Sequence, residues 1–149
     1  MDKRYHLALF SPGYIELILI GQKTIESRFS KIRCAPYGKI RQGDVIYMKE
    51  IGGPIKGVMR AGKIETFTNL TNDDIILIDA TNRRNIFCDW SFKSHLVRWH
   101  DCKYATLIHV DDYIKCIEPS YYKNSSRMPW VVLDEKLSLN KKHDRYYDL

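Results

Sequence analysis

Gly21-Gln22-Lys23-Thr24-Ile25-Glu26-Ser27-Arg28-Phe29-Ser30 links the end of a predicted short helix to a predicted strand. Side chains of a strand alternate between its two faces, so one face is expected to carry Thr24, Glu26 and Arg28 and the other Ile25, Ser27 and Phe29. A glutamate and an arginine two positions apart on one face can pair, and the arginine then presents a fixed fork of donors to a phosphate or a base edge. The sequence therefore predicts a functional site on this strand.

The sequence on both sides of this strand predicts further strands separated by short helices. Tyr5 to Phe10 is an apolar run of strand length, and Ser11 and Pro12 are typical of the start of a helix over Tyr14 to Ile20. The remaining expected elements are strands over 45–49, 55–67 (with bends or bulges at Gly57 and Gly62), 104–110, 113–117 and 129–133, and helices over 72–79 and 89–99. No long helix lies between strands, as a parallel sheet would require. We therefore predict an α+β, mainly β fold, a bent pseudo-barrel of about five or six mostly antiparallel strands with short capping helices.

The length and composition fit one folded domain. A chain of 149 residues that is 44% hydrophobic and 28% charged lies in the ordinary globular range. We expect the domain to span 1–134 and a charged tail over 135–149 to be a loosely held helix or disordered. The longest apolar run, Tyr14 to Ile20, is far shorter than the ~20 residues of a membrane span, and the N-terminus leaves no room for a signal peptide. We therefore expect a soluble, cytoplasmic protein with no membrane partner.

Positive charge is concentrated in one part of the sequence. The net charge is +6, and between Lys23 and Lys63 there are ten basic residues and only three acids, an excess of +7. A positive surface attracts polyanions such as nucleic acids. A solvated basic face that only keeps the protein soluble is an equally good interpretation of charge alone.

The cysteines give no metal or redox motif. Those at positions 34, 88, 102 and 116 are widely spaced, so we expect buried hydrophobic residues and no metal or cofactor. The alternative is a zinc cluster, whose ligands would be Cys88, His95, His100 and Cys102.

The pattern Gly21-x-Lys23-x-x-Glu26-x-Arg28, followed by Gly43-Asp44 before a strand, resembles the signature of the ASCH domain, a branch of the PUA-like superfamily. The resemblance covers Leu7 to Thr66 and returns at Trp130 to Leu133. It implies a pseudo-barrel with a cleft beside the signature, and the binding of RNA or a nucleotide-like ligand. One branch of the family hydrolyses the acetyl amide of acetylated cytidine with a Lys, a Thr and a downstream Glu. Lys23 matches that Lys, whereas Glu26 stands in place of the Thr, and the region after Leu70 offers Asp73, Asp74 and Asp79 in place of the Glu.

Three functions are compatible with these residues. The first is a module that binds RNA or a nucleotide, with Glu26 on a polar base edge and phosphate contacts from Lys23, Arg28, Lys31, Arg33 and Lys39. Tyr121 and Arg127, in the loop before the last strand, are expected to add exposed contacts. The second is an enzyme, an amidohydrolase on a modified nucleoside or a ribonuclease, with Lys23 and Glu26 as the acid–base pair. The third is a domain that binds an acidic peptide. Aromatic residues of the predicted helix over 89–99, Trp90 and Trp99, are expected in the core.

Overall fold

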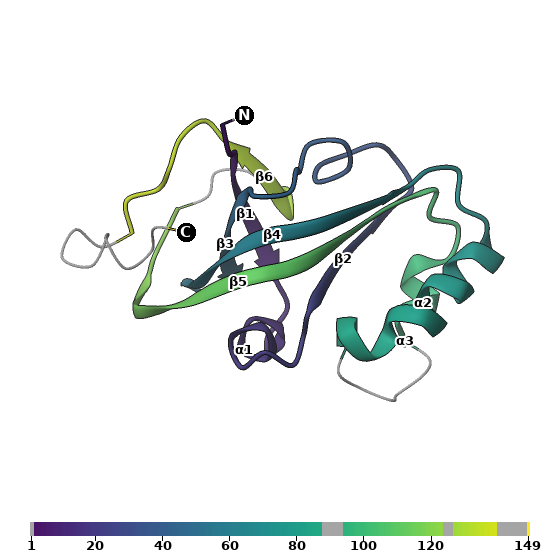
Figure 1. Cartoon of the computed structure of the whole chain (residues 1–149), viewed down its shortest axis with the longest axis horizontal. Helices are drawn as coiled ribbons and strands as arrows, with labels where there is room; N and C mark the ends of the chain where they lie inside the picture. Colours follow the sequence, from purple (N-terminus) through teal and green to yellow (C-terminus); the bar gives the residue numbers. More distant parts are fainter. Residues whose placement is uncertain (1, 88–93, 124–126, 140–148) are drawn as a thin grey trace.

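A computed structural model describes residues 2–87, 94–123, 127–139 and 149. Six strands and three helices are described in these ranges (Figure 1). The strands are β1 (Tyr5–Phe10), β2 (Ile25–Ser30), β3 (Val45–Glu50), β4 (Ile55–Phe67), β5 (Tyr104–Ser120) and β6 (Trp130–Leu133). The helices are α1 (Tyr14–Leu19), α2 (Asn72–Phe87) and α3 (Ser94–Trp99).

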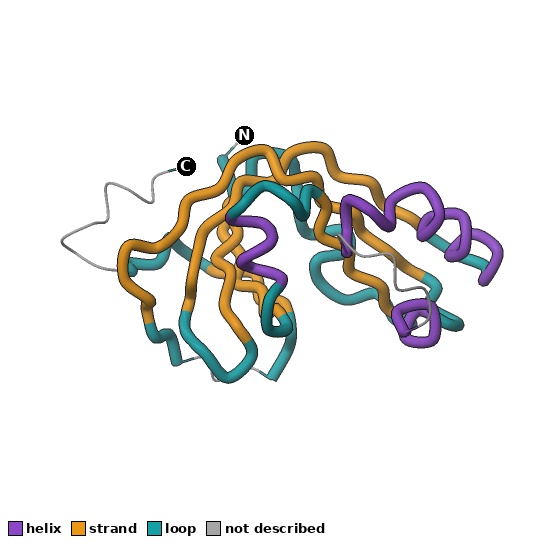
Figure 2. The backbone as a smooth tube through the Cα atoms, turned by 90° about the horizontal axis from the view of Figure 1, so that it is seen from below, coloured by secondary structure: helices purple, strands orange, loops and turns teal. Residues whose placement is uncertain are grey.

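All six strands belong to one bent sheet in the order β2-β5-β4-β3-β1-β6. Only β1 and β3 pair in parallel, and the other neighbours are antiparallel. The long strands β4 and β5 run side by side and curve the sheet into a half-barrel, with α2 and α3 together beyond one end of it (Figures 1 and 2). The predicted mainly β pseudo-barrel is confirmed.

Two elements are longer than the sequence predicts. β5 continues through Asp111 and Asp112, where a break was expected, because the strand pairs with β4 on both sides of Asp111. Arg60 of β4 also pairs with both carboxylates. The register of β4 against β5 shifts between Ile55 and Gly57, between Arg60 and Ala61, and between Ala61 and Ile64. The first and last shifts confirm the bulges predicted at Gly57 and Gly62. α2 runs to Phe87, two turns past its predicted end, because Ile86 is buried against the sheet and anchors a polar stretch that has no helical period of its own.

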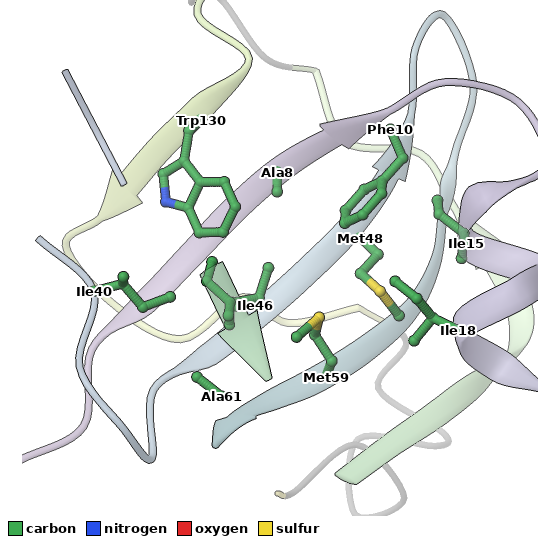
Figure 3. Packing of buried hydrophobic residues seen from close by; sticks show 11 residues of the cluster. Ala8, Phe10, Ile15, Ile18, Ile40, Ile46, Met48, Met59, Ala61 and Trp130 are labelled. Atoms are coloured by element: carbon green, nitrogen blue, oxygen red, sulfur yellow. The ribbon is translucent and has the colours of Figure 1, made fainter. Parts of the chain in front are cut away.

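Three groups of buried side chains hold these elements together. On the concave face, Ile15 and Ile18 of α1 point towards Met48 and Met59 (Figure 3). A second group packs α2 and α3 against β2 and β5, and a third lies on the other face of β3 and β4. The described part of the C-terminal tail belongs to the third group. Leu137 and Leu139 pack there, and residues 135–139 form no helix.

A buried hydrogen-bond network joins β1, β6 and the loop before β3. The indole Nε1 of Trp130 donates to Nδ1 of His6 (3.0 Å), and an indole N–H can only donate, so Nδ1 accepts. Nε2 of His6 therefore carries the proton and donates to Oδ2 of Asp44 (2.8 Å). Asp44 also accepts from the backbone N–H groups of Arg4 (2.9 Å) and Arg41 (3.0 Å). The neutral His6 ring thus fits its surroundings and a protonated ring would not.

The free energy of unfolding is expected to fall with pH below about 6.5. Burial lowers the pKa of His6 from the ordinary 6.5, and this outweighs the opposite effect of Asp44. Between the lowered and the ordinary pKa the unfolded chain binds a proton that the folded chain does not, so acid favours unfolding by about 1 kcal/mol per pH unit. Urea unfolding at pH 7.5, 6.5 and 5.5 should show a smaller slope for His6→Gln than for the unchanged protein. His100→Gln, at an exposed ring, should keep the full slope. An unchanged slope in His6→Gln would refute the assignment.

Candidate functional site

A cavity of about 450 Å³ opens at the free edge of β2. Among the described strands, β2 pairs with β5 alone, and no described strand covers its other edge. The cavity lies between this edge, the end of β1 with the start of α1, and the ends of α2 and α3. Its lining consists of Leu9, Phe10, Ser11, Tyr14, Lys23, Glu26, Ser27, Arg28, Phe29, Ile51, Ile86, Phe87, Arg98, Trp99 and Pro129.

Glu26 is the carboxylate of the cavity. Its side chain is buried, with 7% of its surface exposed. Oε1 accepts a hydrogen bond from the backbone N–H of Ser27 (2.9 Å) and lies 3.5 Å from Nε of Arg28. Oε2 accepts no hydrogen bond from the described residues. This oxygen can therefore accept from a donor that enters the cavity.

Arg28 forms an ion pair with Glu26, but its fork of donors is directed at the protein itself. Nη2 donates to the carbonyl of Leu9 (2.8 Å), and Nη1 donates to the carbonyl of Pro129 (3.4 Å). The guanidinium also lies 5.1 Å from the ring centroids of both Phe10 and Trp130. These contacts connect the free edge of β2 to β1 and to the segment before β6. Arg28 therefore shapes the wall of the cavity, and the fork predicted for a phosphate is used within the chain.

Lys23 is buried, with 3% of its surface exposed, instead of reaching into solvent. Nζ donates to the carbonyl oxygens of Ile25 (2.8 Å) and Ile86 (2.7 Å) and lies 5.4 Å from the ring centroid of Tyr14. Ile86 belongs to the last turn of α2, where backbone carbonyls lack helical partners and a cation is favoured. Lys23 thus ties β2 to the end of α2 while its stem lines the cavity.

Arg98 and Trp99 of α3 complete the cavity and were not predicted as site residues. Arg98 is exposed, and its side chain has no partner among the described residues. Trp99 is 8% exposed and stacks on Phe29 with 3.9 Å between ring centroids, so its predicted core position is confirmed, although it also forms a cavity wall. Trp90 lies outside the described residues. No sequence signal connects α3 to the signature, because only the chain topology brings them together.

The remaining predicted contact residues lie apart from the cavity. All are exposed and none belongs to its lining: Lys31, Arg33, Lys39, Tyr121 and Arg127. The guanidinium of Arg33 lies 5.5 Å from the ring centroid of Tyr104. A smaller cavity of about 70 Å³ touches Cys34 to Tyr37 and shares Arg28, Phe29 and Pro129 with the larger one. The structure therefore brings together Lys23, Glu26 and Arg28 in the lining of the larger cavity, and the basic residues Lys31, Arg33 and Lys39 lie outside this lining.

No arrangement of histidine, cysteine and acidic residues that could hold a metal occurs in the part of the chain described here. Cys88 and the side chain of His95 lie outside that part. Cys102 and Cys116 are buried as predicted, and burial raises the pKa of the Cys116 thiol to about 11. Within the described ranges, no helix combines the length and apolar character of a membrane crossing.

The described chain forms a six-stranded, mostly antiparallel half-barrel with a cavity at an edge strand. Comparison with solved structures identifies this architecture as the ASCH fold. The crystal structure of ASCH from Zymomonas mobilis superposes with a TM-score of 0.61 at 14% identity, covering 90% of each chain. Two point mutants of that protein give TM-scores of 0.61 and 0.59 at 14% and 16% identity, covering 90% and 78% of this chain and 91% and 75% of theirs. No protein-family model and no curated protein matches the sequence. The resemblance read from the signature is thus confirmed for the fold.

Proposed function

We propose that the cavity binds one nucleotide, either free or as part of single-stranded RNA. The observation that carries the proposal is Oε2 of Glu26 at the cavity wall, which accepts no hydrogen bond from the described residues. An acceptor-only group in such a place favours a ligand that brings N–H donors, and the amino group of a nucleobase is one. Arg98, an exposed cation on the same lining, is the group we assign to the phosphate.

The size and lining of the cavity support this ligand class. About 450 Å³ lies within the range of roughly 300–1,000 Å³ typical of small-molecule sites. The lining includes the five aromatic rings of Phe10, Tyr14, Phe29, Phe87 and Trp99, which suit a flat base. It carries three cations, Lys23, Arg28 and Arg98, against the single carboxylate of Glu26, so its formal charge of +2 favours an anion.

The enzymatic alternative, an amidohydrolase or ribonuclease with Lys23 and Glu26 as the acid–base pair, has less support. A lysine acts as a general base only after losing a proton. Nζ of Lys23 is instead used as a hydrogen-bond donor to the carbonyl oxygens of Ile25 and Ile86. Binding without turnover is therefore the function that the geometry supports best.

Glu26→Gln is expected to weaken nucleotide binding about tenfold or more, because it removes the charge from the acceptor that faces the ligand. Calorimetric titration with the four nucleoside monophosphates and with a short single-stranded RNA measures the effect. Glu135→Gln, at an exposed carboxylate outside the lining, is the matched control and should bind normally. Equal affinity of Glu26→Gln and the unchanged protein would contradict the proposal, and release of product would favour the enzyme.

The phosphate contact is tested by salt. RNA affinity should fall with rising salt, and Arg98→Gln should reduce the slope of log K against log salt by about 1. Lys63→Gln, on an exposed cation outside the lining, should leave the slope unchanged. A combined Lys31→Gln, Arg33→Gln and Lys39→Gln variant shows whether the basic loop adds contacts. If only this variant changed the slope, the phosphate would lie on the loop and the role of Arg98 would be refuted.

A further inference from the structure

The backbone of β2 presents a fixed set of hydrogen-bonding groups to the cavity. The N–H of Val110 donates to the carbonyl of Thr24 (2.9 Å), one step before the first paired residues Ile25 and His109, whereas the N–H of Thr24 donates to the carbonyl of Asn85. The bond from Val110 sets the phase of the ladder between β2 and β5. Hydrogen-bonded pairs recur at every second residue, so the backbone groups of Glu26 and Arg28 face β5, and those of Ile25, Ser27 and Phe29 face away from it. Two side-chain contacts agree with this phase: Nζ of Lys23 reaches the carbonyl of Ile25, and Oε1 of Glu26 accepts from the N–H of Ser27.

After those two contacts, the N–H of Ile25, the carbonyl of Ser27 and both backbone groups of Phe29 remain on the free edge. Outside the ladder between β2 and β5, none of them has a hydrogen-bond partner among the described residues. Ser27 and Phe29 line the cavity, and the Phe29 carbonyl lies beyond the Phe29 N–H along the edge. Because the Glu26 carboxylate caps the N–H of Ser27, it sits on the same edge, just before the Ser27 carbonyl. Along the edge, the cavity therefore offers an acceptor from Glu26, an acceptor from Ser27 and a donor from Phe29, in this order.

We propose that this edge of β2 reads an amino-bearing nucleobase, with guanine as the best match; the inference rests on the proposed nucleotide site. A complementary ligand must present donor, donor and acceptor in sequence. Guanine does so on three neighbouring groups, its N2 amine, N1–H and O6. Adenine and cytosine supply the same order only if one amine serves both Glu26 and Ser27. Uracil has a carbonyl on each side of its single N–H, and one of these would face the Glu26 carboxylate.

The walls on either side of the edge suit a base lying in the plane of the sheet. Phe29, Phe87 and Trp99 belong to the buried group on the helical side of β2. Phe10 and Tyr14 belong to the group on the concave side. A flat ring bonded to the strand edge would thus have aromatic neighbours on both faces.

The test compares ligands that differ in one group. Guanosine and inosine monophosphates differ only in the N2 amine, so calorimetric titration of the unchanged protein should give at least about tenfold tighter binding of guanosine monophosphate. Uridine monophosphate should bind most weakly of the common four. In Glu26→Gln the ratio between guanosine and inosine monophosphates should shrink, which measures the coupling between this side chain and the amine.

The possible results separate the two proposals. If all nucleotides bind with similar affinity, the reading of the base edge is refuted and the nucleotide site stands. If the ratio between guanosine and inosine monophosphates is the same in Glu26→Gln, the contact of Glu26 with the amine is refuted. If none of the nucleotides and no RNA binds, both proposals fall.

Discussion

Arg28→Ala is expected to lower the free energy of unfolding by about 3–5 kcal/mol, the largest effect of any substitution considered. The guanidinium, 19% exposed, bonds the carbonyls of Leu9 and Pro129 and neutralises the buried Glu26 carboxylate. Alanine leaves both carbonyls without this donor and the carboxylate without its cation. It also empties the space between the rings of Phe10 and Trp130. Because these contacts join β2 to β1, the half-barrel should open at the cavity.

Urea unfolding at neutral pH measures the loss. Arg28→Lys should recover only part of the stability, since an ammonium cannot reach both carbonyls with the planar fork of arginine. Arg127→Ala, at an exposed arginine, should change the free energy of unfolding by less than about 0.5 kcal/mol. A loss below about 1 kcal/mol for Arg28→Ala would show that the contacts are not needed to hold the strands together.

Lys23→Met is expected to cost about 2–4 kcal/mol, although methionine preserves most of the apolar stem. The substitution deprives the buried carbonyls of Ile25 and Ile86 of a charged donor. Ile86 lies in the last turn of α2. The substitution should therefore loosen the end of this helix as well as lower the free energy of unfolding of the whole domain. We expect faster amide hydrogen exchange over residues 84–87 than over the first turns of α2.

Lys39→Met supplies the control for this substitution, because the Lys39 side chain is exposed. Its unfolding midpoint and exchange rates should match those of the unchanged protein. If Lys23→Met behaved like Lys39→Met, the ammonium would contribute nothing to the attachment of α2. A loss of ligand binding in Lys23→Met has meaning for function only after correction for this stability change.

Local patterns in the sequence predict most of the sheet. β1 and β4 have the bounds predicted, because each is an apolar run bounded by turn residues. The end of α2 and the continuity of β5 depend on long-range contacts, Ile86 against the sheet and the pairing of β5 with β4 on both sides of Asp111. No local period encodes such contacts, so these two boundaries could not be predicted.

In the candidate site, too, the sequence predicts the arrangement of residues that are neighbours in the chain but not their contacts with distant residues. The strand alternation correctly places Glu26 and Arg28 together. It could not show that Arg28 donates to the carbonyl of Leu9, or that Lys23 donates to the carbonyl of Ile86, because these acceptors belong to other elements. Arg98 reaches the cavity only through the topology. The sequence therefore predicts which strand carries the site. The fold determines which of its charged side chains bond within the protein and which can contact a ligand.

Backbone amide chemical shifts test the central claim most directly, namely that the free edge of β2 is a ligand site. Guanosine monophosphate is titrated into the isotope-labelled protein. We predict that the amides of Ser27 and Phe29 and the indole N–H of Trp99 shift together and saturate with one dissociation constant. Saturable shifts confined to the basic loop around Lys31 to Lys39, or to Tyr121 and Arg127, with Ser27 and Phe29 unmoved, would contradict the claim.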